Sequence, residues 1–238
     1  MIAAPIHIGT SRLMLDPAGA IFWPQQSILA VADLHFEKAT HYAEKGQLLP
    51  PWDTGLTLDR LAPIIRRYAP KTLLALGDSF HDPRAAGRIT QVDAKKLAQI
   101  AETIDLIWVL GNHDPTPPEG LPGRALDEYQ REHITFRHHP VQGSGHEVFG
   151  HFHPRATIPA RGGSLTRPCF MADNRRVLLP AFGAFTGGLD VRNHAIAGLF
   201  PRGARAFLLG KERLYSFTLA QLRGVPESSM AELPLKSG

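Results

Sequence analysis

The sequence lacks three features that would each place it in a particular class of protein. It has one cysteine, Cys169, so an internal disulfide and a cage of thiolate metal ligands are both excluded. No apolar run reaches the ~18–20 residues that a membrane-spanning helix needs. Residues 1–5 lack the basic flank and apolar block of a secretory signal. Together these absences predict a cytoplasmic protein without disulfides.

No internal repeat, low-complexity block or long linker divides the chain. With 238 residues and 43% hydrophobic content, it can bury a substantial core. We therefore predict a single domain over residues 1–238, with its core at about 6–217 and a polar C-terminal tail from about 226. Cys169 lies in an apolar run with Phe170 and Met171, which favours a buried thiol over a nucleophile.

Charge is unevenly divided along the chain. Residues 1–120 carry a net charge of −2 and residues 121–238 a net charge of +6, with very little lysine in the second part. Arginine forks match the geometry of phosphate, so a polyanionic substrate is one interpretation and an ordinary solvated surface is the other. The arginines concerned are Arg155, Arg161, Arg167, Arg175, Arg176, Arg192, Arg202 and Arg205.

The first half alternates short apolar runs with amphipathic segments. A hairpin is expected over residues 6–23, and buried strands are expected to end at Asp33, Asp78 and Asn112. Helices are predicted over Asp53–Tyr68 and around Asp93–Thr103, the first capped by Asp53. The buried face of that first helix is expected to contain Leu56, Leu61, Ile64, Ile65 and Tyr68. This order predicts an α/β fold with a parallel sheet and right-handed crossovers.

The second half favours short strands instead of helices. Gly210-Lys211-Glu212 suits a hairpin turn, and the Pro/Gly-rich stretches 114–123 and 180–190 are expected to be surface loops. The predicted strands are Ile134–Arg137, Glu147–Phe149, Arg167–Ala172, Arg176–Pro180, Ala195–Leu199, Arg205–Leu209 and Arg213–Phe217.

Four short segments place metal-binding side chains where a predicted buried strand ends. They are Asp33-Leu34-His35, Gly77-Asp78, Gly111-Asn112-His113-Asp114 and Gly150-His151-Phe152-His153. Sites in open α/β sheets gather where the strands end. Carboxylates, an amide and several imidazoles converging there suit a pair of divalent metals.

These motifs resemble the calcineurin-like metallophosphoesterase superfamily, whose pattern is D-x-H, G-D, G-N-H-[DE], an isolated His and G-H-x-H in this order. The resemblance implies a two-sheet sandwich flanked by helices, with a two-metal site at one end of the sheets. It also implies that Asp33, His35 and His153 bind one metal, that Asn112 and His151 bind the second, and that Asp78 bridges both.

The isolated histidine of this pattern must come from Arg137-His138-His139-Pro140. The superfamily often has a histidine two positions before a proline, which selects His138. Strand alternation would then point His139 to the opposite side. Another departure is His81, which stands where many members have Asp or Asn, and we expect it to alter the surroundings of the metal ligands.

Asn112 and His113 are expected to contact the substrate phosphate. His113 resembles the superfamily histidine that is not a ligand and that protonates the leaving alkoxide, a role that imidazolium can fill near neutral pH. Asp114 either orients the ring of His113 by a hydrogen bond or is a loop residue before Pro115.

A narrower resemblance covers most of residues 6–217 and points to the bacterial ligase-associated DNA damage response endonuclease family (the PdeM family). Its segments here are Phe22-Trp23-Pro24, residues 31–38, Leu48-Leu49-Pro50-Pro51, residues 77–82 and residues 179–189. The likeness implies a Mn²⁺-dependent phosphodiesterase, with Fe, Zn²⁺ or Co²⁺ as other fits to the ligand set. The resemblance also implies a gene encoded beside those of an ATP-dependent DNA ligase, an exonuclease and a helicase, and hence a functional association with these proteins.

The predicted function is therefore a dinuclear-metal phosphoesterase that hydrolyses phosphodiesters, in the form of a DNA-repair endonuclease. A small-molecule enzyme of the same chemistry, acting on cyclic nucleotides or phosphomonoesters, is the nearest alternative. A non-catalytic metal-binding scaffold within a repair assembly is the more distant one.

Overall fold

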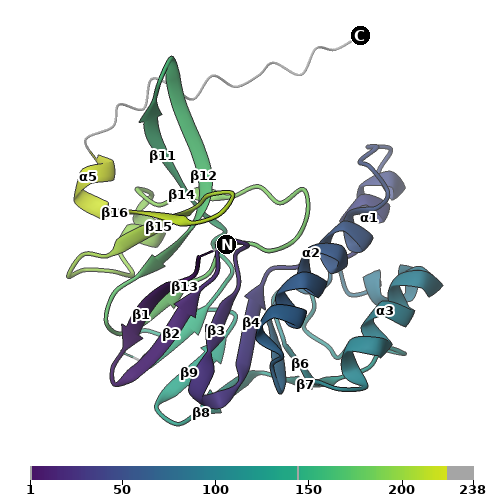
Figure 1. Ribbon diagram of the computed structural model, residues 1–238. Helices are drawn as coiled ribbons and strands as arrows, with labels where there is room; N and C mark the ends of the chain where they lie inside the picture. Colours follow the sequence, from purple (N-terminus) through teal and green to yellow (C-terminus); the bar gives the residue numbers. More distant parts are fainter. Residues whose placement is uncertain (1, 144, 224–238) are drawn as a thin grey trace.

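Two β-sheets pack face to face in the computed structural model, which describes residues 2–143 and 145–223 (Figure 1). The first sheet has the order β1-β2-β3-β4-β5-β6-β7. Its strands are β1 (Ala4–Ile8), β2 (Ser11–Leu15), β3 (Ile21–Trp23), β4 (Ile28–Ala32), β5 (Thr72–Leu76), β6 (Asp105–Val109) and β7 (Arg124–Leu126).

The second sheet is built only from later segments of the chain. Its main path is β14-β11-β12-β13-β10-β9-β8, and β15 pairs with both β12 and β16. The strands are β8 (Glu128–Arg131), β9 (Ile134–Arg137), β10 (His146–Phe149), β11 (Pro154–Ala160), β12 (Gly163–Ala172), β13 (Arg176–Leu178), β14 (Leu189–Asp190), β15 (Arg205–Leu209) and β16 (Leu214–Thr218). The β11–β12 hairpin projects from the body of the molecule (Figure 1).

The helices divide between the outer faces of the two sheets. The first sheet carries α1 (Lys38–Glu44), α2 (Asp53–Tyr68) and α3 (Gln91–Ala101) on one side, as Figure 1 shows. α4 (His194–Ala197) and α5 (Leu219–Arg223) pack in the cluster that covers the second sheet. Two short 3-10 turns, Pro24–Gln26 and Ala85–Arg88, complete the described elements. This mixed α/β arrangement confirms the predicted two-sheet fold.

The main core lies between the sheets. Leu13 and Trp23 from the first sheet meet Phe136, Val148 and Phe170 from the second, and all five are almost fully buried. A fully buried side chain of this size stabilises the folded state by about 1.5–3 kcal/mol through the hydrophobic effect. This layer therefore fixes how the two sheets lie against each other, and with them the loops at their ends.

The strands that lead into the predicted site run parallel and in register. β4 pairs with β5 so that Ala32 lies opposite Leu76, and β5 pairs with β6 so that Leu76 lies opposite Val109. The predicted parallel sheet of the first half is thus confirmed. Because the three strands end at the same level, the segments that follow them meet at one edge.

The helix over Asp53–Tyr68 has the predicted ends, but two details of the prediction are wrong. Asp53 is the first helical residue and does not cap the helix; its carboxylate accepts a hydrogen bond from Ala39 N, 3.1 Å away. Leu56 is 39% exposed, whereas Leu58 is 2% exposed and packs on the sheet. Residues two apart on a helix lie on nearly opposite faces, so both could not be buried.

The second predicted helix begins two residues earlier, at Gln91, because Thr90 caps it by accepting a hydrogen bond from Asp93 N. The strand predicted over Ala195–Leu199 is wrong. That segment overlaps α4, which begins at His194, where the Asn193 side chain accepts a hydrogen bond from Ala195 N. Side-chain capping satisfies orphan N–H groups and favours a helical start over an extended chain.

Further elements were not predicted at all, notably α1, β7, β8, β11 and β14. Cys169 is fully buried as predicted, and burial raises the pKa of its thiol. The tail predicted from about residue 226 lies outside the described residues. Among those that are described, no helix is long and apolar enough to cross a membrane.

Candidate metal centre

The predicted metal-binding side chains come together at one end of both sheets. Asp33 follows β4 directly, Asp78 lies two residues after β5, and Asn112 lies three residues after β6. From the second sheet, His138 follows β9, and His151 lies two residues after β10. The site is therefore assembled from strand ends of two sheets.

The backbone at these strand ends adopts left-handed conformations that side-chain-bearing residues rarely use. The φ angles of Asp33, His35, Asp78, His151 and His153 all lie between 45° and 77°. Each such residue costs of order 1–3 kcal/mol and persists only where its surroundings enforce it. Here His35 N donates to Asp78 O at 2.9 Å and Asp33 N to Gly77 O at 3.2 Å, so the first two loops hold each other.

Close packing of the loops explains one of the glycines in the motifs. Gly77 has a φ of 67°, and a Cβ placed on it would clash with the ring of His138. Only glycine lets the backbone before Asp78 pass directly beneath an imidazole of the second sheet.

Asp33, His35 and His153 form a first group of candidate ligands. His35 Nε2 lies 3.2 Å from His153 Nε2, and His153 Nε2 lies 3.4 Å from Asp33 Oδ1. Burial, helped by the nearby His153, lowers the pKa of His35 to about 2. Its imidazole is therefore neutral and has a lone pair to offer a cation.

His138 is at the centre of a second group. Its Nε2 lies 3.1 Å from Asn112 Oδ1, 3.3 Å from His151 Nδ1 and 3.3 Å from Asp78 Oδ2. Its Nδ1 donates to the carbonyl of Leu76 at 3.1 Å, which directs Nε2 into the site. A backbone carbonyl on the far ring nitrogen is the usual support of a metal-binding histidine.

Electrostatics differ between the two imidazoles of this group. Burial opposes the charged form of His138, but its contact with Asp78 and the charge of Asp33 outweigh this and raise its pKa. Burial together with His139 and His138 lowers the pKa of His151 to about 4. Asp78 keeps a pKa below its usual range, because the favourable contact with His138 outweighs its burial.

Shared residues join the two groups into one centre. Asp33, Asp78 and His138 form a third set whose ligand atoms lie within 4.8 Å of one another. Ring nitrogens facing each other at 3.2–3.3 Å beside buried carboxylates repel unless a proton or a cation lies between them. Mixed imidazole and carboxylate donors are what divalent transition metals bind, so the residues fit a two-metal centre.

His139 does not point away from the site, contrary to the alternation argument. β9 ends at Arg137, so the next two residues are no longer an extended strand with alternating side chains. The ring of His139 lies 4.0 Å from that of His151 and 4.5 Å from that of His138. His138, His139 and His151 also form a candidate ligand group, but His139 is exposed, whereas His138 is 2% exposed and held by a backbone carbonyl.

His113 lies at the edge of the centre, with its side chain 43% exposed. Its backbone N–H donates to Asp78 Oδ1 at 2.9 Å, and its Nε2 lies 3.9 Å from Asp78 Oδ2. The ring is held by His81, because His113 Nδ1 donates to the carbonyl of that residue at 3.0 Å. Nδ1 is therefore held by the main chain, and Nε2, beside Asp78, is the ring nitrogen that could face a substrate.

Of the two alternatives for Asp114, the one in which its carboxylate orients this ring does not hold. Its carboxylate accepts hydrogen bonds from the backbone N–H groups of Asp78, Ser79, Phe80 and Gly111, at 2.8–3.2 Å. Burial, with the charge of Asp78, raises the pKa of Asp114 to about 6. Asp114 thus ties the loop after β6 to the loop after β5.

Sequence reasoning noted His81 as a departure but missed its position. Its Nδ1 lies 3.3 Å from Nδ1 of His35, and its ring stacks on that of His113 at a centroid distance of 5.5 Å. Burial, with the nearby His41 and Lys38, lowers the pKa of His81 to about 4. His41 and His81 also have ring centroids 4.7 Å apart, so imidazoles continue outward from the first ligand group.

Comparison with known proteins gives a family and a structural relative. A sequence model described as calcineurin-like phosphoesterase matches residues 27–180, which contain every candidate ligand. The crystal structure of Pseudomonas putida nuclease MPE is 28% identical, with a TM-score of 0.73 over 91% of this chain and 100% of that one. Yfce, a phosphoesterase from E. coli, is 15% identical with a TM-score of 0.40 over 81% of this chain and 98% of that one. No curated protein matches the sequence.

Proposed function

The chain belongs to the calcineurin-like phosphoesterase family, and from this premise we propose that it is a two-metal phosphodiesterase that cleaves DNA. The observation that carries the proposal is the set of three candidate ligand groups that share Asp33 and His138. The similarity to the Pseudomonas putida nuclease supports nucleic acid as the substrate.

In this proposal each metal has three ligands of its own, and one ligand is shared. Asp33, His35 and His153 hold the first metal, and Asn112, His138 and His151 hold the second. Asp78, whose carboxylate lies beside the second group, is the bridge. When bound, two divalent ions lower the pKa of water and neutralise the charge that grows on a phosphate under attack.

The chain itself supplies the proton for the leaving group. As the oxygen of a water molecule bonds to phosphorus and the P–O bond to the leaving oxygen breaks, the proton on His113 Nε2 passes to that leaving oxygen. The carbonyl of His81 holds the other proton on Nδ1, so the ring keeps one orientation before and after the transfer. The half-exposed side chain of His113 leaves room for a polymer to approach.

Asn112 and His113 would also contact the phosphate, since both side chains are accessible at the edge of the centre. Asp114 acts indirectly, by holding the loops that carry Asp78 and His113. Mn²⁺ is the metal we propose, in a cytoplasmic, single-domain DNA-repair enzyme over residues 1–238. We extend this to functional association with an ATP-dependent DNA ligase, an exonuclease and a helicase.

Metal reconstitution tests the proposal. Chelator-treated protein should hydrolyse neither bis-p-nitrophenyl phosphate nor a single-stranded oligonucleotide, and added Mn²⁺ should restore both activities together with two ions per chain by elemental analysis. Turnover of cyclic nucleotides or phosphomonoesters without DNA cleavage would favour the small-molecule alternative. Two bound ions without hydrolysis of any phosphoester would favour the scaffold.

A further inference from the structure

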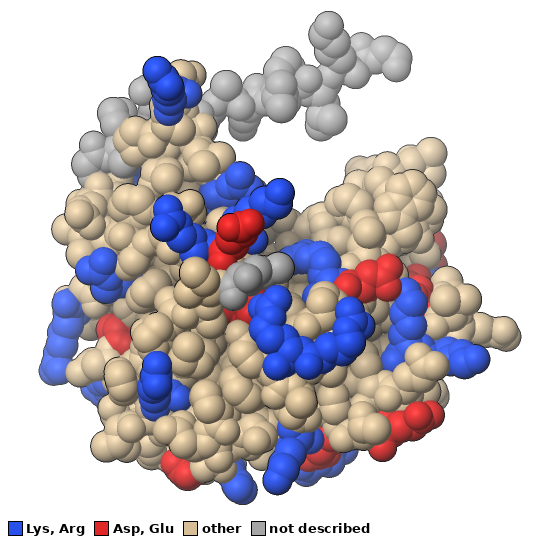
Figure 2. Space-filling view, viewed as in Figure 1, with Lys and Arg blue, Asp and Glu red and all other residues tan. Residues whose placement is uncertain are grey.

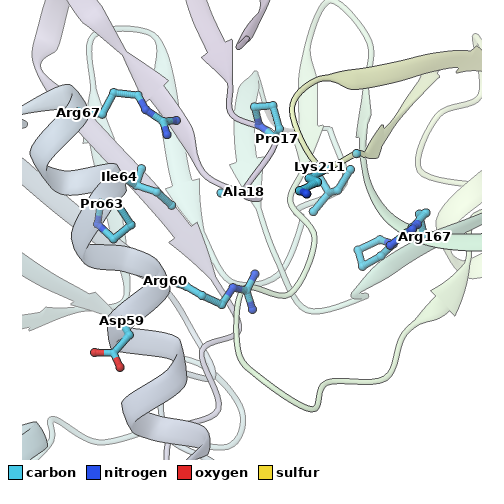
Figure 3. A pocket seen from close by; sticks show the side chains of 12 residues that line it. Pro17, Ala18, Asp59, Arg60, Pro63, Ile64, Arg67, Arg167 and Lys211 are labelled. Atoms are coloured by element: carbon cyan, nitrogen blue, oxygen red, sulfur yellow. The ribbon is translucent and has the colours of Figure 1, made fainter. Parts of the chain in front are cut away.

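A cavity of about 730 Å³ lies between α2 and the strands of the second sheet, away from the metal ligands. Four cationic side chains, Arg60, Arg67, Arg167 and Lys211, line it together with apolar residues such as Ile64 and Leu209. We call it the basic groove. Figure 3 shows Arg60 extending from α2 into this space, with Arg167 and Lys211 on the opposite wall.

The positive charge of the basic groove is only partly neutralised. Arg67 is paired with the buried Asp16 at 2.5 Å, and Asp59, an acidic residue of the lining, is paired with Lys96 at 2.9 Å. Within the part of the chain that the structure describes, no ion pair involves Arg60, Arg167 or Lys211. Figure 2 shows Lys and Arg side chains gathered near the centre of this face.

The guanidinium of Arg60 is held in place by its own surroundings. It donates to the carbonyl of Phe182 at 3.0 Å and lies 4.8 Å from the centre of the Phe182 ring. Burial lowers the pKa of Arg60, but a guanidinium stays charged at neutral pH. Arg60 is therefore a fixed positive charge at the side of the basic groove, whereas Arg167 and Lys211 are exposed and free to adjust.

A single segment separates the basic groove from the metal centre. Phe182 accepts from Arg60 on one side, and on the other side Gly183 N donates to the carbonyl of Asp33 at 3.1 Å. A Cβ on Gly183 would clash with the carbonyl of Leu34, so this contact requires glycine. Arg60, which lines the basic groove, is thus linked through Phe182 and Gly183 to the backbone of Asp33, a candidate metal ligand.

We propose that the basic groove binds the strand of single-stranded DNA that continues from the cleaved phosphodiester. Phosphates would lie against Arg60, Arg167 and Lys211, and bases against the apolar side chains between them. The cavity has the volume of a small-ligand site, which suits a few unpaired nucleotides. This inference rests on the proposed nuclease function and adds where its substrate lies.

The test compares two double variants of equal charge. Arg167→Gln with Lys211→Gln removes two cations from the basic groove, and neither residue belongs to the metal centre. Arg161→Gln with Arg202→Gln is the matched control, because both arginines are exposed and neither lines the basic groove. The substrates are a single-stranded 12-mer and bis-p-nitrophenyl phosphate, with Mn²⁺ present.

The groove variant should raise KM for the 12-mer about tenfold at low salt. The slope of the logarithm of the binding constant against the logarithm of the salt concentration should become shallower by about 1.4, or about 0.7 for each lost phosphate contact. Hydrolysis of the small diester should stay at the wild-type level, as should both activities of the control. Equal KM values and salt slopes for the groove variant and the wild type would overturn the inference. Wild-type protein that hydrolyses the small diester but neither binds nor cleaves DNA would instead overturn the nuclease function.

Discussion

The metal centre and the basic groove differ in how their charged side chains are held. In the metal centre, Asp33 is fully buried and both of its carboxylate oxygens share the N–H of His151, while His138 is fixed by a backbone carbonyl. In the basic groove, Arg167 and Lys211 are exposed, with no ion pair among the described residues. Chemistry at one phosphate needs donors preorganised to a fraction of an ångström, whereas holding a long polyanion needs only accessible charge.

This difference predicts that single substitutions in the metal centre abolish most of the activity, whereas those in the basic groove lower the affinity for DNA in small steps. The largest effect is expected for Asp78→Asn. Removing the bridging charge should lose one or both ions and lower the rate by several orders of magnitude, measured by elemental analysis and by hydrolysis of an aryl diester. Asp59→Asn, which removes an exposed carboxylate from α2, is the control and should retain two ions. A variant of Asp78 that keeps two ions and its turnover would show that Asp78 is not the bridge.

His138 and His139 allow a buried and an exposed histidine of the metal centre to be compared directly. His138→Ala should weaken the second metal and lower activity by orders of magnitude, because Nε2 of this buried ring faces three other ligand atoms. His139→Ala should lower activity by no more than about tenfold, the lower end of the range for residues that support ligands. Activity at saturating Mn²⁺ measures both. The reverse ranking would assign the ligand role to the exposed His139.

The next substitution tests whether the half-exposed His113 is the general acid. His113→Ala should retain both metals and lose about 10²–10⁴-fold in kcat on DNA or an alkyl diester. The loss should be much smaller on a nitrophenyl ester, whose leaving group needs no proton. A residue that only positions phosphate would penalise both substrates alike, so equal losses would remove His113 from the role of acid.

The smallest effect concerns protons within the second ligand group. A metal binds the neutral form of imidazole. Because the pKa of His138 is raised, this ring still carries a proton at a pH where an ordinary histidine is neutral, and the metal must displace that proton. Metal affinity should therefore rise with pH through the neutral range and level off above the pKa of His138. His151, with a pKa lowered to about 4, contributes nothing to this rise.

NMR titration of the ring protons in metal-free protein checks the assignment. His138 should titrate above 6.5 and His151 well below it. Two midpoints near 6.5 would contradict the electrostatic difference between these rings. The exposed His139, whose pKa is lowered by burial and by His138, provides the internal comparison.

Much of the first half could be predicted because its signals are local. Apolar runs ending in Asp or Gly gave the strands β4, β5 and β6, and helical periodicity gave both ends of α2. The pairing of the two sheets was expected only from the family resemblance, since no periodicity reveals which strands face each other. A short apolar segment such as 195–199 can form a strand or a helix. Here the side-chain cap before it favours the helix, and the apolar pattern alone does not include that cap.

At the metal centre, residue types were predicted better than contacts. A hydrogen bond from Asp114 to the ring of His113, its neighbour in sequence, was one of two alternatives, but the carboxylate accepts hydrogen bonds from four backbone N–H groups of two loops instead. The carbonyl of His81 holds the ring instead. Every residue has a backbone carbonyl, so the sequence alone cannot show which one accepts this hydrogen bond. His139 was misplaced because alternation was extended beyond the end of β9.

Because the ligands come from two sheets, the order in which the chain is synthesised and folded also decides when metal can bind. When synthesis has passed residue 112, the chain holds Asp33, His35, Asp78 and Asn112, but His138, His151 and His153 have still to emerge. Neither ligand group is complete until the second sheet has docked on the first. Tight capture of both ions is therefore a late step in folding, and their binding free energy stabilises only chains that have joined the two sheets correctly.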